Sequence, residues 1–283
     1  VVAFEEPGMA AVRSIFLSHG CSVLPMHVDG AGADPSTLGH AKPKLAFVTA
    51  AKQQPLTIAM PAKRKLELLN WAATTGALIV EDDLGSEFRY EGRPIPPLKV
   101  MDQQNLVVYI GAFSMSLLQT LRIGYMILPR DLAAKCRQLL QVQFRAMPQI
   151  TEQILARFIE LGHFNRHLQK MRRVYSKRQE RLLNILNDKF SHIFEPPILS
   201  AGFYNLCRFR DQSVNDNLIL TLCNERGLGI EQLSYYYSGN QAERKGLLVG
   251  FASSTEEEIE FGMSILKDCI EQHRLWSGAQ RTY

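Results

Sequence analysis

The 283-residue chain lacks the cysteine pattern and the long apolar run that mark disulfide-bonded and membrane-spanning proteins. Its five cysteines, at positions 21, 136, 207, 223 and 269, form an odd, scattered set with no Cys-x-x-Cys pair. Such a set favours free thiols in a reducing compartment over a disulfide framework or a zinc site. The residues from 106 to 121, which end the longest uncharged stretch, are too few and too polar for a bilayer span. The first residues run directly into Glu5, Glu6 and Pro7, unlike a signal peptide. We therefore expect a cytoplasmic protein without a membrane partner.

The chain also has little net charge and few catalytic signatures. Its 32 Lys and Arg oppose 28 Asp and Glu, and the resulting net charge of +4 gives no strong indication of a nucleic-acid partner. No P-loop, HExxH or GxSxG motif is present. Gly30-Ala31-Gly32 is interpreted as a turn, because Pro35 stands where a dinucleotide fingerprint has its third glycine. The segment 163–189 is rich in Arg and Lys, and we interpret it as a helix with a solvated basic face rather than a phosphate-binding surface.

Strand-like and helix-like segments alternate in the first half of the chain, which predicts an α/β layer fold with a mostly parallel sheet. Short apolar runs predict strands at 21–28, 45–49, 77–80, 106–110 and 123–128. Helices are expected at 7–20 and 61–73, each beginning near a proline and ending near a glycine.

Helical patterns dominate after Pro129, followed by a smaller mixed region. Helices are predicted at 131–147, 149–161, 163–189, 214–226 and 255–271, and strands at 203–208 and 246–251. We expect a large domain at 1–130, a helical connector at 131–180, a small α+β domain at 181–272 and a frayed tail at 273–283.

Three predicted strands end in polar side chains that suit a ligand site. Asp82 follows a buried strand, and a carboxylate there can keep a ring nitrogen protonated, as a pyridine electron sink requires. Ser114 and Arg122 follow a second strand, and hydroxyls with a guanidinium can clamp a phosphate. Gln54 follows a third. Since the carboxyl ends of parallel strands meet at one edge of a sheet, these groups are expected to face one crevice.

The same segments resemble the aminotransferase-like domain of the MocR/GabR transcriptional regulators, which belong to the fold-type I pyridoxal-phosphate (PLP) proteins. The resemblance is collinear up to Glu271, and its most specific blocks are EDDLGSEFRYEGRPIP at 81–96 and GHFNRHLQKMRRVY at 162–175. Further matching segments are FEEPGM at 4–9, TAAKQQPLTIAM at 49–60, YIGAFSMSLLQTLRIGY at 109–125 and GLLVGFASSTEEEIEFG at 246–262.

The resemblance implies a PLP-transferase type I-like fold and a homodimer. It also implies that Asp82 contacts the pyridinium nitrogen, that Ser114 and Arg122 contact the phosphate, and that Gln54 stands near the ring oxygen. The chain begins at the family's VEDPGY segment, so we expect an N-terminally incomplete large domain. DNA binding is then expected only through a winged-helix domain absent from this chain.

Several positions depart from the family pattern. Met115 occupies the position of the Schiff-base lysine, and a thioether cannot form an aldimine. Ala112 replaces a phosphate-binding threonine, and Leu84 replaces a ring-contacting tyrosine. Lys52 replaces the usual histidine and is either an amine near the site or a solvated loop lysine.

Two functions compete on this basis. The first is a non-catalytic effector-sensing and dimerisation domain of a MocR-like regulator, with an amino-acid-like effector. The alternative is a PLP-dependent class I/II aminotransferase acting on an amino acid. Met115 favours the first, because transamination needs an amine at that position. Covalent PLP binding is not expected.

Overall fold

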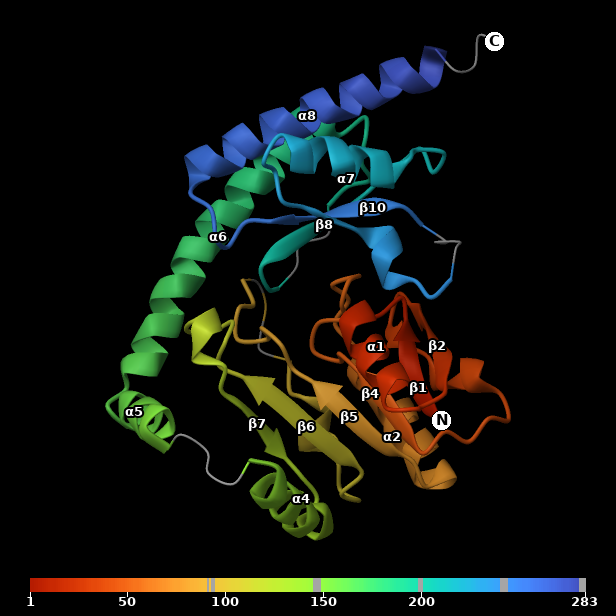
Figure 1. Cartoon of the computed structure of the whole chain (residues 1–283), viewed down its shortest axis with the longest axis vertical. Coiled ribbons are helices and arrows are strands. Elements are labelled where there is room, and N and C mark those ends of the chain that lie inside the picture. Colours follow the sequence, from red (N-terminus) through yellow and green to blue (C-terminus); the bar gives the residue numbers. More distant parts are fainter. Residues whose placement is uncertain (91, 93–94, 145–148, 198–200, 240–243, 280–283) are drawn as a thin grey trace.

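A seven-stranded sheet forms the centre of the N-terminal half of the chain (Figure 1). The computed structural model describes residues 1–279 except 91, 93–94, 145–148, 198–200 and 240–243. The strand order is β3-β2-β1-β4-β5-β6-β7, with five parallel strands in the middle and antiparallel strands β3 and β7 at the two edges. The strands are β1 (Val2–Glu6), β2 (Val23–Asp29), β3 (Gly32–Ala33), β4 (Leu45–Val48), β5 (Leu78–Asp82), β6 (Val107–Ala112) and β7 (Gly124–Ile127). The predicted mostly parallel α/β sheet is thereby confirmed.

Strand β1 was not predicted, although it lies in the middle of the sheet between β2 and β4. Its residues Val2, Ala3 and Phe4 are buried, as expected for a strand covered on both faces. The run of apolar residues is only four long before Glu5, which is too short for periodicity to separate a strand from the start of a helix.

Alternate residues of the strands pack on opposite faces of the sheet, because successive side chains of a strand point to opposite sides. Phe4 and Phe47 stack on one face with ring centroids 5.1 Å apart, and Phe16 of helix α1 (Ala10–Ser18) covers them edge-on. Ala3, Ala46 and Ile79 face the other side, against Leu68, Leu69 and Ala72 of helix α2 (Ala62–Thr75). The sheet is therefore sandwiched between helices (Figure 1).

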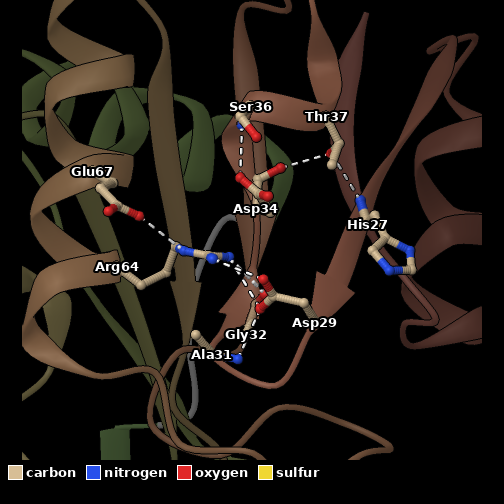
Figure 2. A network of polar contacts seen from close by, with 9 residues as sticks. All are labelled: His27, Asp29, Ala31, Gly32, Asp34, Ser36, Thr37, Arg64 and Glu67. Atoms are coloured by element: carbon tan, nitrogen blue, oxygen red, sulfur yellow. Dashed lines mark hydrogen bonds and ion pairs between the residues drawn. The ribbon is translucent and has the colours of Figure 1, made fainter.

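Arg64 of α2 ties this helix to the β2–β3 edge of the sheet (Figure 2). Its guanidinium donates to both carboxylate oxygens of Asp29, at 3.2 and 2.8 Å, and to the carbonyl of Gly32 at 3.2 Å. Glu67 accepts a further bond from Nε at 3.0 Å. The Arg64 hydrogen bonds lower the pKa of Asp29 below its ordinary value. Gly30-Ala31-Gly32 forms the turn into β3, as predicted, with Ala31 N–H bonded to Asp29.

Three helices lead from the sheet to the C-terminal part: α4 (Arg130–Phe144), α5 (Gln149–Glu160) and α6 (His163–Phe190). The last three residues of the predicted helix 131–147 lie outside the described residues. Leu168 and Leu182 of α6 are buried, as the apolar stripe predicts. Two side chains of its basic face are exposed and also bond to neighbouring elements: Arg172 donates to the carbonyl of Glu87 at 2.6 Å, and Arg181, with its side chain 40% exposed, pairs with Glu260.

A second core lies in the C-terminal part, where a three-stranded antiparallel sheet of order β8-β10-β9 packs against helices. Its elements are β8 (Tyr204–Arg208), α7 (Asp216–Glu225), β9 (Glu231–Gln232), β10 (Gly246–Gly250) and α8 (Glu256–Ala279). Short helices elsewhere are η1 (Pro35–Leu38), α3 (Leu98–Met101), η2 (Gln119–Leu121) and η3 (Leu233–Tyr236). The N-terminal and C-terminal parts each contain a core, and the domain division stays a prediction.

Helix α8 begins with a reciprocal cap: Glu258 N–H donates to Thr255 Oγ1 at 3.2 Å, and Thr255 N–H donates to Glu258 Oε2 at 2.7 Å. The helix continues to Ala279, so the expectation of a frayed tail from position 273 is wrong up to that residue. His273 is buried against the small core and contacts Asn215 N–H, which favours helical continuation. Residues 280–283 of the expected tail lie outside the described part.

Within the described part of the chain, no helix combines the length and apolar character needed to cross a membrane. The same residues contain no group of three or more His, Cys, Asp and Glu side chains that could hold a metal ion.

Candidate functional site

A cleft of about 660 Å³ lies where the loops after β4, β5 and β6 face the small C-terminal sheet. Loops from the large sheet contribute Lys52, Gln54, Leu84, Ser114, Met115, Leu117, Leu118 and Gln119. The opposite wall consists of Tyr175, Phe203, Tyr204, Gly229, Ile230, Glu231, Tyr236, Leu248, Gly250, Ala252 and Ser253. Its position at the carboxyl ends of parallel strands is the usual ligand crevice of open α/β sheets.

Met115 and Ser114 reach the cleft from the turn that follows β6. This turn is held by Phe113 N–H donating to Ile123 O at 3.0 Å and by Leu117 N–H donating to Phe113 O at 2.9 Å. His167 of α6 donates from Nε2 to the carbonyl of Ser116 at 3.0 Å and fixes the turn to the long helix. The wall thus presents a thioether and a hydroxyl at the point where the resemblance implies a lysine and a phosphate ligand.

Asp82 is the last residue of β5, next to Asp83. Burial, and secondarily the neighbouring carboxylate of Asp83, raises the pKa of Asp82 to about 6. Asp83 accepts a hydrogen bond from the Tyr109 hydroxyl at 2.7 Å, whereas none of the described residues donates one to Asp82. A half-buried carboxylate without a partner can accept a proton or a cationic N–H from a ligand.

Gln54 connects the two walls of the cleft. Its side-chain amide donates to the hydroxyl of Tyr236 at 3.4 Å, and that hydroxyl donates to Glu231. Its backbone N–H donates to Thr49 Oγ1 at 3.0 Å. The amide is therefore oriented by both the β4 loop and the small domain.

Lys52 extends into the cleft beside Tyr204. Its Nζ lies 4.0 Å from the centroid of the Tyr204 ring, on which a cationic amine is stabilised by the ring quadrupole. Desolvation lowers the pKa of Lys52 from 10.5 to about 7. Of the two interpretations left open by the sequence, the position in the cleft wall favours an amine near the site over a solvated loop lysine.

The structure brings Gln54, Ser114 and Met115 together in one cleft, while Asp82 and Arg122 lie outside the set of residues that line it. The Arg122 side chain is exposed after η2. Ala112, the last residue of β6, has no hydroxyl. The donors that the resemblance implies for PLP, a phosphate clamp and an amine at position 115, are therefore not assembled here. The residues present do not fit PLP held through an amine at position 115 and a phosphate clamp.

One buried group near this edge was missed by sequence reasoning. Glu5, at the end of β1, accepts bonds from Thr49 Oγ1 at 2.6 Å and Thr49 N at 3.1 Å. Burial raises the pKa of Glu5 to about 7, with Asp82 adding a small repulsion. Reading residues 2–6 as a strand would have placed Glu5 at the same sheet edge as Asp82. Tyr204 and Tyr236, from the small domain, carry no sequence signal that separates them from core aromatics.

Comparisons with known proteins identify relatives of two kinds. The HTH-type transcriptional regulator YhdI of Bacillus subtilis, which is described as uncharacterized, is 32% identical over 266 residues, covering 94% of this chain and 56% of YhdI. The probable rhizopine catabolism regulatory protein MocR of Rhizobium meliloti is 29% identical over 268 residues, covering 94% of this chain and 54% of that protein. The chain thus spans about half the length of these curated relatives. No protein-family model matches it.

Among solved structures, kynurenine aminotransferase of Pyrococcus horikoshii superposes with a TM-score of 0.86 at 21% identity, over 96% of this chain and 69% of that one. At this identity the likeness concerns the fold. The regulators match the sequence over nearly the whole chain, and the aminotransferase matches its architecture. The chain is therefore an aminotransferase-like relative of the MocR-type transcriptional regulators, with the fold of the type I PLP aminotransferases.

Proposed function

We propose that this chain is a non-catalytic effector-sensing and dimerisation domain of a MocR-like transcriptional regulator, with an amino-acid-like effector in the cleft. DNA binding would belong to a separate winged-helix domain of such a regulator. The observation that carries this proposal is the placement of Met115 in the wall of the cleft. A thioether neither condenses with an aldehyde nor accepts and returns a proton, so the residue at this point cannot take part in transamination.

The cleft itself supports a binding role. It joins loops of the large sheet to the small domain, and hydrogen bonds such as Gln54 to Tyr236 cross it. A ligand that contacts both walls stabilises one relative arrangement of the two parts, which is the physical basis for sensing. Asp82, whose carboxylate has a raised pKa, suits the amine of an amino-acid-like ligand if that ligand reaches the end of β5.

Exposed apolar residues support self-association through a second copy of the chain. Tyr125, Met126 and Ile127 of the outer strand β7 are 39%, 47% and 49% exposed. Helices α4 and α5 also expose large aliphatic side chains, namely Leu139, Leu140, Val142, Ile150 and Ile154. An apolar edge strand is a natural template for pairing between copies.

Ligand-induced stabilisation tests the sensing role. Individual amino acids are added at concentrations up to millimolar, and the melting temperature is followed by calorimetry. A ligand at a hundred times its Kd stabilises by about 2.7 kcal/mol, which raises Tm by about 5 °C for a chain of this size. Ser114→Phe, which fills part of the cleft, should abolish the shift, whereas Ser18→Phe on the exposed face of α1 should keep it. Conversion of an amino acid to its keto acid would contradict a non-catalytic domain.

Light scattering tests the dimer. We expect a dimer at micromolar concentration that Met126→Lys weakens and that Leu66→Lys, an equally exposed position on α2, leaves unchanged. A monomer at all concentrations would contradict the dimerisation role.

A further inference from the structure

The amine of Lys52 is held in an unusual environment within the cleft. Its side chain passes over Gly202, where the absence of a side chain leaves space for the aliphatic stem, and its Nζ faces the ring of Tyr204 at 4.0 Å. Among the residues that the structure describes, none forms an ion pair or a hydrogen bond with Nζ. The amine is therefore positioned by packing and by the ring of Tyr204, and it lines the cleft.

Desolvation without a compensating carboxylate makes this amine a nucleophile. Burial lowers the pKa of Lys52 to about 7. At neutral pH about half of the molecules therefore carry a neutral amine at this position. An ordinary lysine has less than about one part in a thousand in that form. Neutral, desolvated lysines are the ones that condense with carbonyl groups.

The walls around Lys52 indicate which carbonyl compound fits. Aromatic and apolar side chains dominate them, including Phe203, Tyr204 and Leu248. Glu231 is the one carboxylate in the lining, and Lys52 the one basic side chain. With Lys52 neutral, no cation of the lining remains to balance a carboxylate or phosphate on the ligand.

We propose that Lys52 is a covalent capture site for uncharged aromatic aldehydes in the cleft. The neutral Nζ adds to the carbonyl carbon, and the resulting carbinolamine loses its oxygen as water, which leaves a C=N bond between Nζ and the aldehyde carbon. The step consumes no oxidant or reductant and is reversed by water. The inference rests on the proposed function in using the same cleft, and it adds a second, covalently held class of ligand to the amino-acid-like effector.

Lys65 provides an internal control. It is also buried, at 2% exposure, and burial lowers its pKa as well. Its Nζ, however, donates to the carbonyl of Pro96 at 2.6 Å, and it does not line the cleft. Burial of a lysine alone therefore does not produce the same reactivity, and Lys65 should stay unmodified.

The test is reductive trapping with benzaldehyde. The folded chain is incubated with benzaldehyde and cyanoborohydride, and the modified lysines are located by peptide mass mapping. We expect a benzyl group on Lys52 at a rate about tenfold above that of exposed lysines, since the larger free-amine fraction outweighs the lower basicity. 4-Carboxybenzaldehyde, an anionic aldehyde of similar intrinsic reactivity, should modify Lys52 several-fold more slowly.

Two variants test whether the amine of Lys52 is the group that reacts. Lys52→Met removes the amine and Lys52→Arg keeps a cation without the amine; circular dichroism establishes that each is folded. Both should lose the fast-reacting site. Equal labelling of all lysines, or faster labelling of Lys65 than Lys52, would overturn the inference. If amino acids stabilise the chain while Lys52 stays unlabelled, the sensing role survives without it. If an added amino acid is converted to its keto acid, the non-catalytic role fails while Lys52 capture stands.

Discussion

The Lys52 side chain fills the space that a side chain at Gly202 would need: a Cβ there would lie 1.9 Å from Lys52 Nζ and 2.8 Å from its Cε. The backbone of Gly202 is itself held on both sides. Its N–H donates to Phe88 O at 2.8 Å, and its carbonyl accepts from the Tyr90 hydroxyl at 2.5 Å. A segment of the small domain thus determines where a lysine of the β4 loop can lie.

Gly202→Ala should therefore destabilise the chain and displace the amine. The backbone at Gly202 has φ +90°, a region that alanine adopts only with strain, so the cost is about 1–3 kcal/mol. Urea unfolding measures this loss. In the double variant with Lys52→Ala, the steric part should disappear while the backbone part remains. Full recovery in the double variant would show that φ strain contributes nothing.

Lys52→Met should make stability less dependent on pH. The folded-state pKa, about 7, lies below the ordinary 10.5, so the unfolded chain binds the proton more tightly between these values. The wild-type chain consequently gains stability from Lys52 as pH rises from 7 towards 10.5. At pH 7 and below, the variant should be more stable by about 3 kcal/mol, allowing for partial exposure of the side chain.

In urea unfolding from pH 6 to 9.5, the difference in unfolding free energy between wild type and Lys52→Met should stay level up to about pH 7 and shrink above it. The matched control is Lys63→Met on the exposed start of α2, which should show a constant difference close to zero. A gap in unfolding free energy between wild type and Lys52→Met that stays constant or widens from about pH 7 to 9.5 would show that burial does not lower the pKa of this amine.

Arg13→Met should loosen the small domain from β1. Arg13 Nη2 donates to the carbonyl of Tyr236 at 2.9 Å and to Glu6 at 3.1 Å, and the guanidinium is largely buried. Removing a buried charged donor costs about 1.5–3 kcal/mol. Hydrogen exchange should become faster at 233–238. Arg157→Met, which breaks an exposed pair with Glu160, should change stability by less than about 1 kcal/mol.

Met115→Lys should not produce an active aminotransferase. The substitution supplies an amine, but Ala112 still lacks a hydroxyl and the exposed Arg122 lies outside the cleft. We expect no keto acid from any amino acid after incubation with PLP, measured by a coupled dehydrogenase assay. Turnover above that of the wild-type chain would show that the lysine is the one missing group.

The sequence predicted the sheet and the long helices because their signals are local. The run 106–110 contains no charged residue and three β-branched residues in five, and Thr255 and Glu258 form the cap of α8 within four residues of each other. The resemblance located Met115, Gln54 and Ser114 at one cleft. It did not predict that Arg122 is exposed, since the orientation of a side chain after a short 3₁₀ turn depends on packing across the chain.

The pairing of Lys52 with Tyr204 was likewise inaccessible to sequence reasoning. The two residues are far apart in the chain, and each is ordinary in its own segment: a lysine in a polar loop and a tyrosine in a strand. Their approach across the cleft places the amine against an aromatic ring, and burial there lowers its pKa. β1 was missed for a related reason, because its burial comes from neighbours on both sides, β2 and β4, rather than from its own four apolar residues.

Helix α6 extends continuously from the α5 end of the molecule to the core of the small domain (Figure 1). Its 28 residues correspond to a rod of about 42 Å. His167 and Arg172 bond its first half to Ser116 and Glu87 of the large part, while Leu182 and Leu186 anchor its second half in the small core. From Arg172 to Phe190 the helix spans about 27 Å, so a tilt of the helix by about 5° about the Arg172 bond would move its Phe190 end by about 2 Å. The helix is thus a rigid link, so a change of tilt at its bonds to Ser116 and Glu87 would be carried to the core of the small domain.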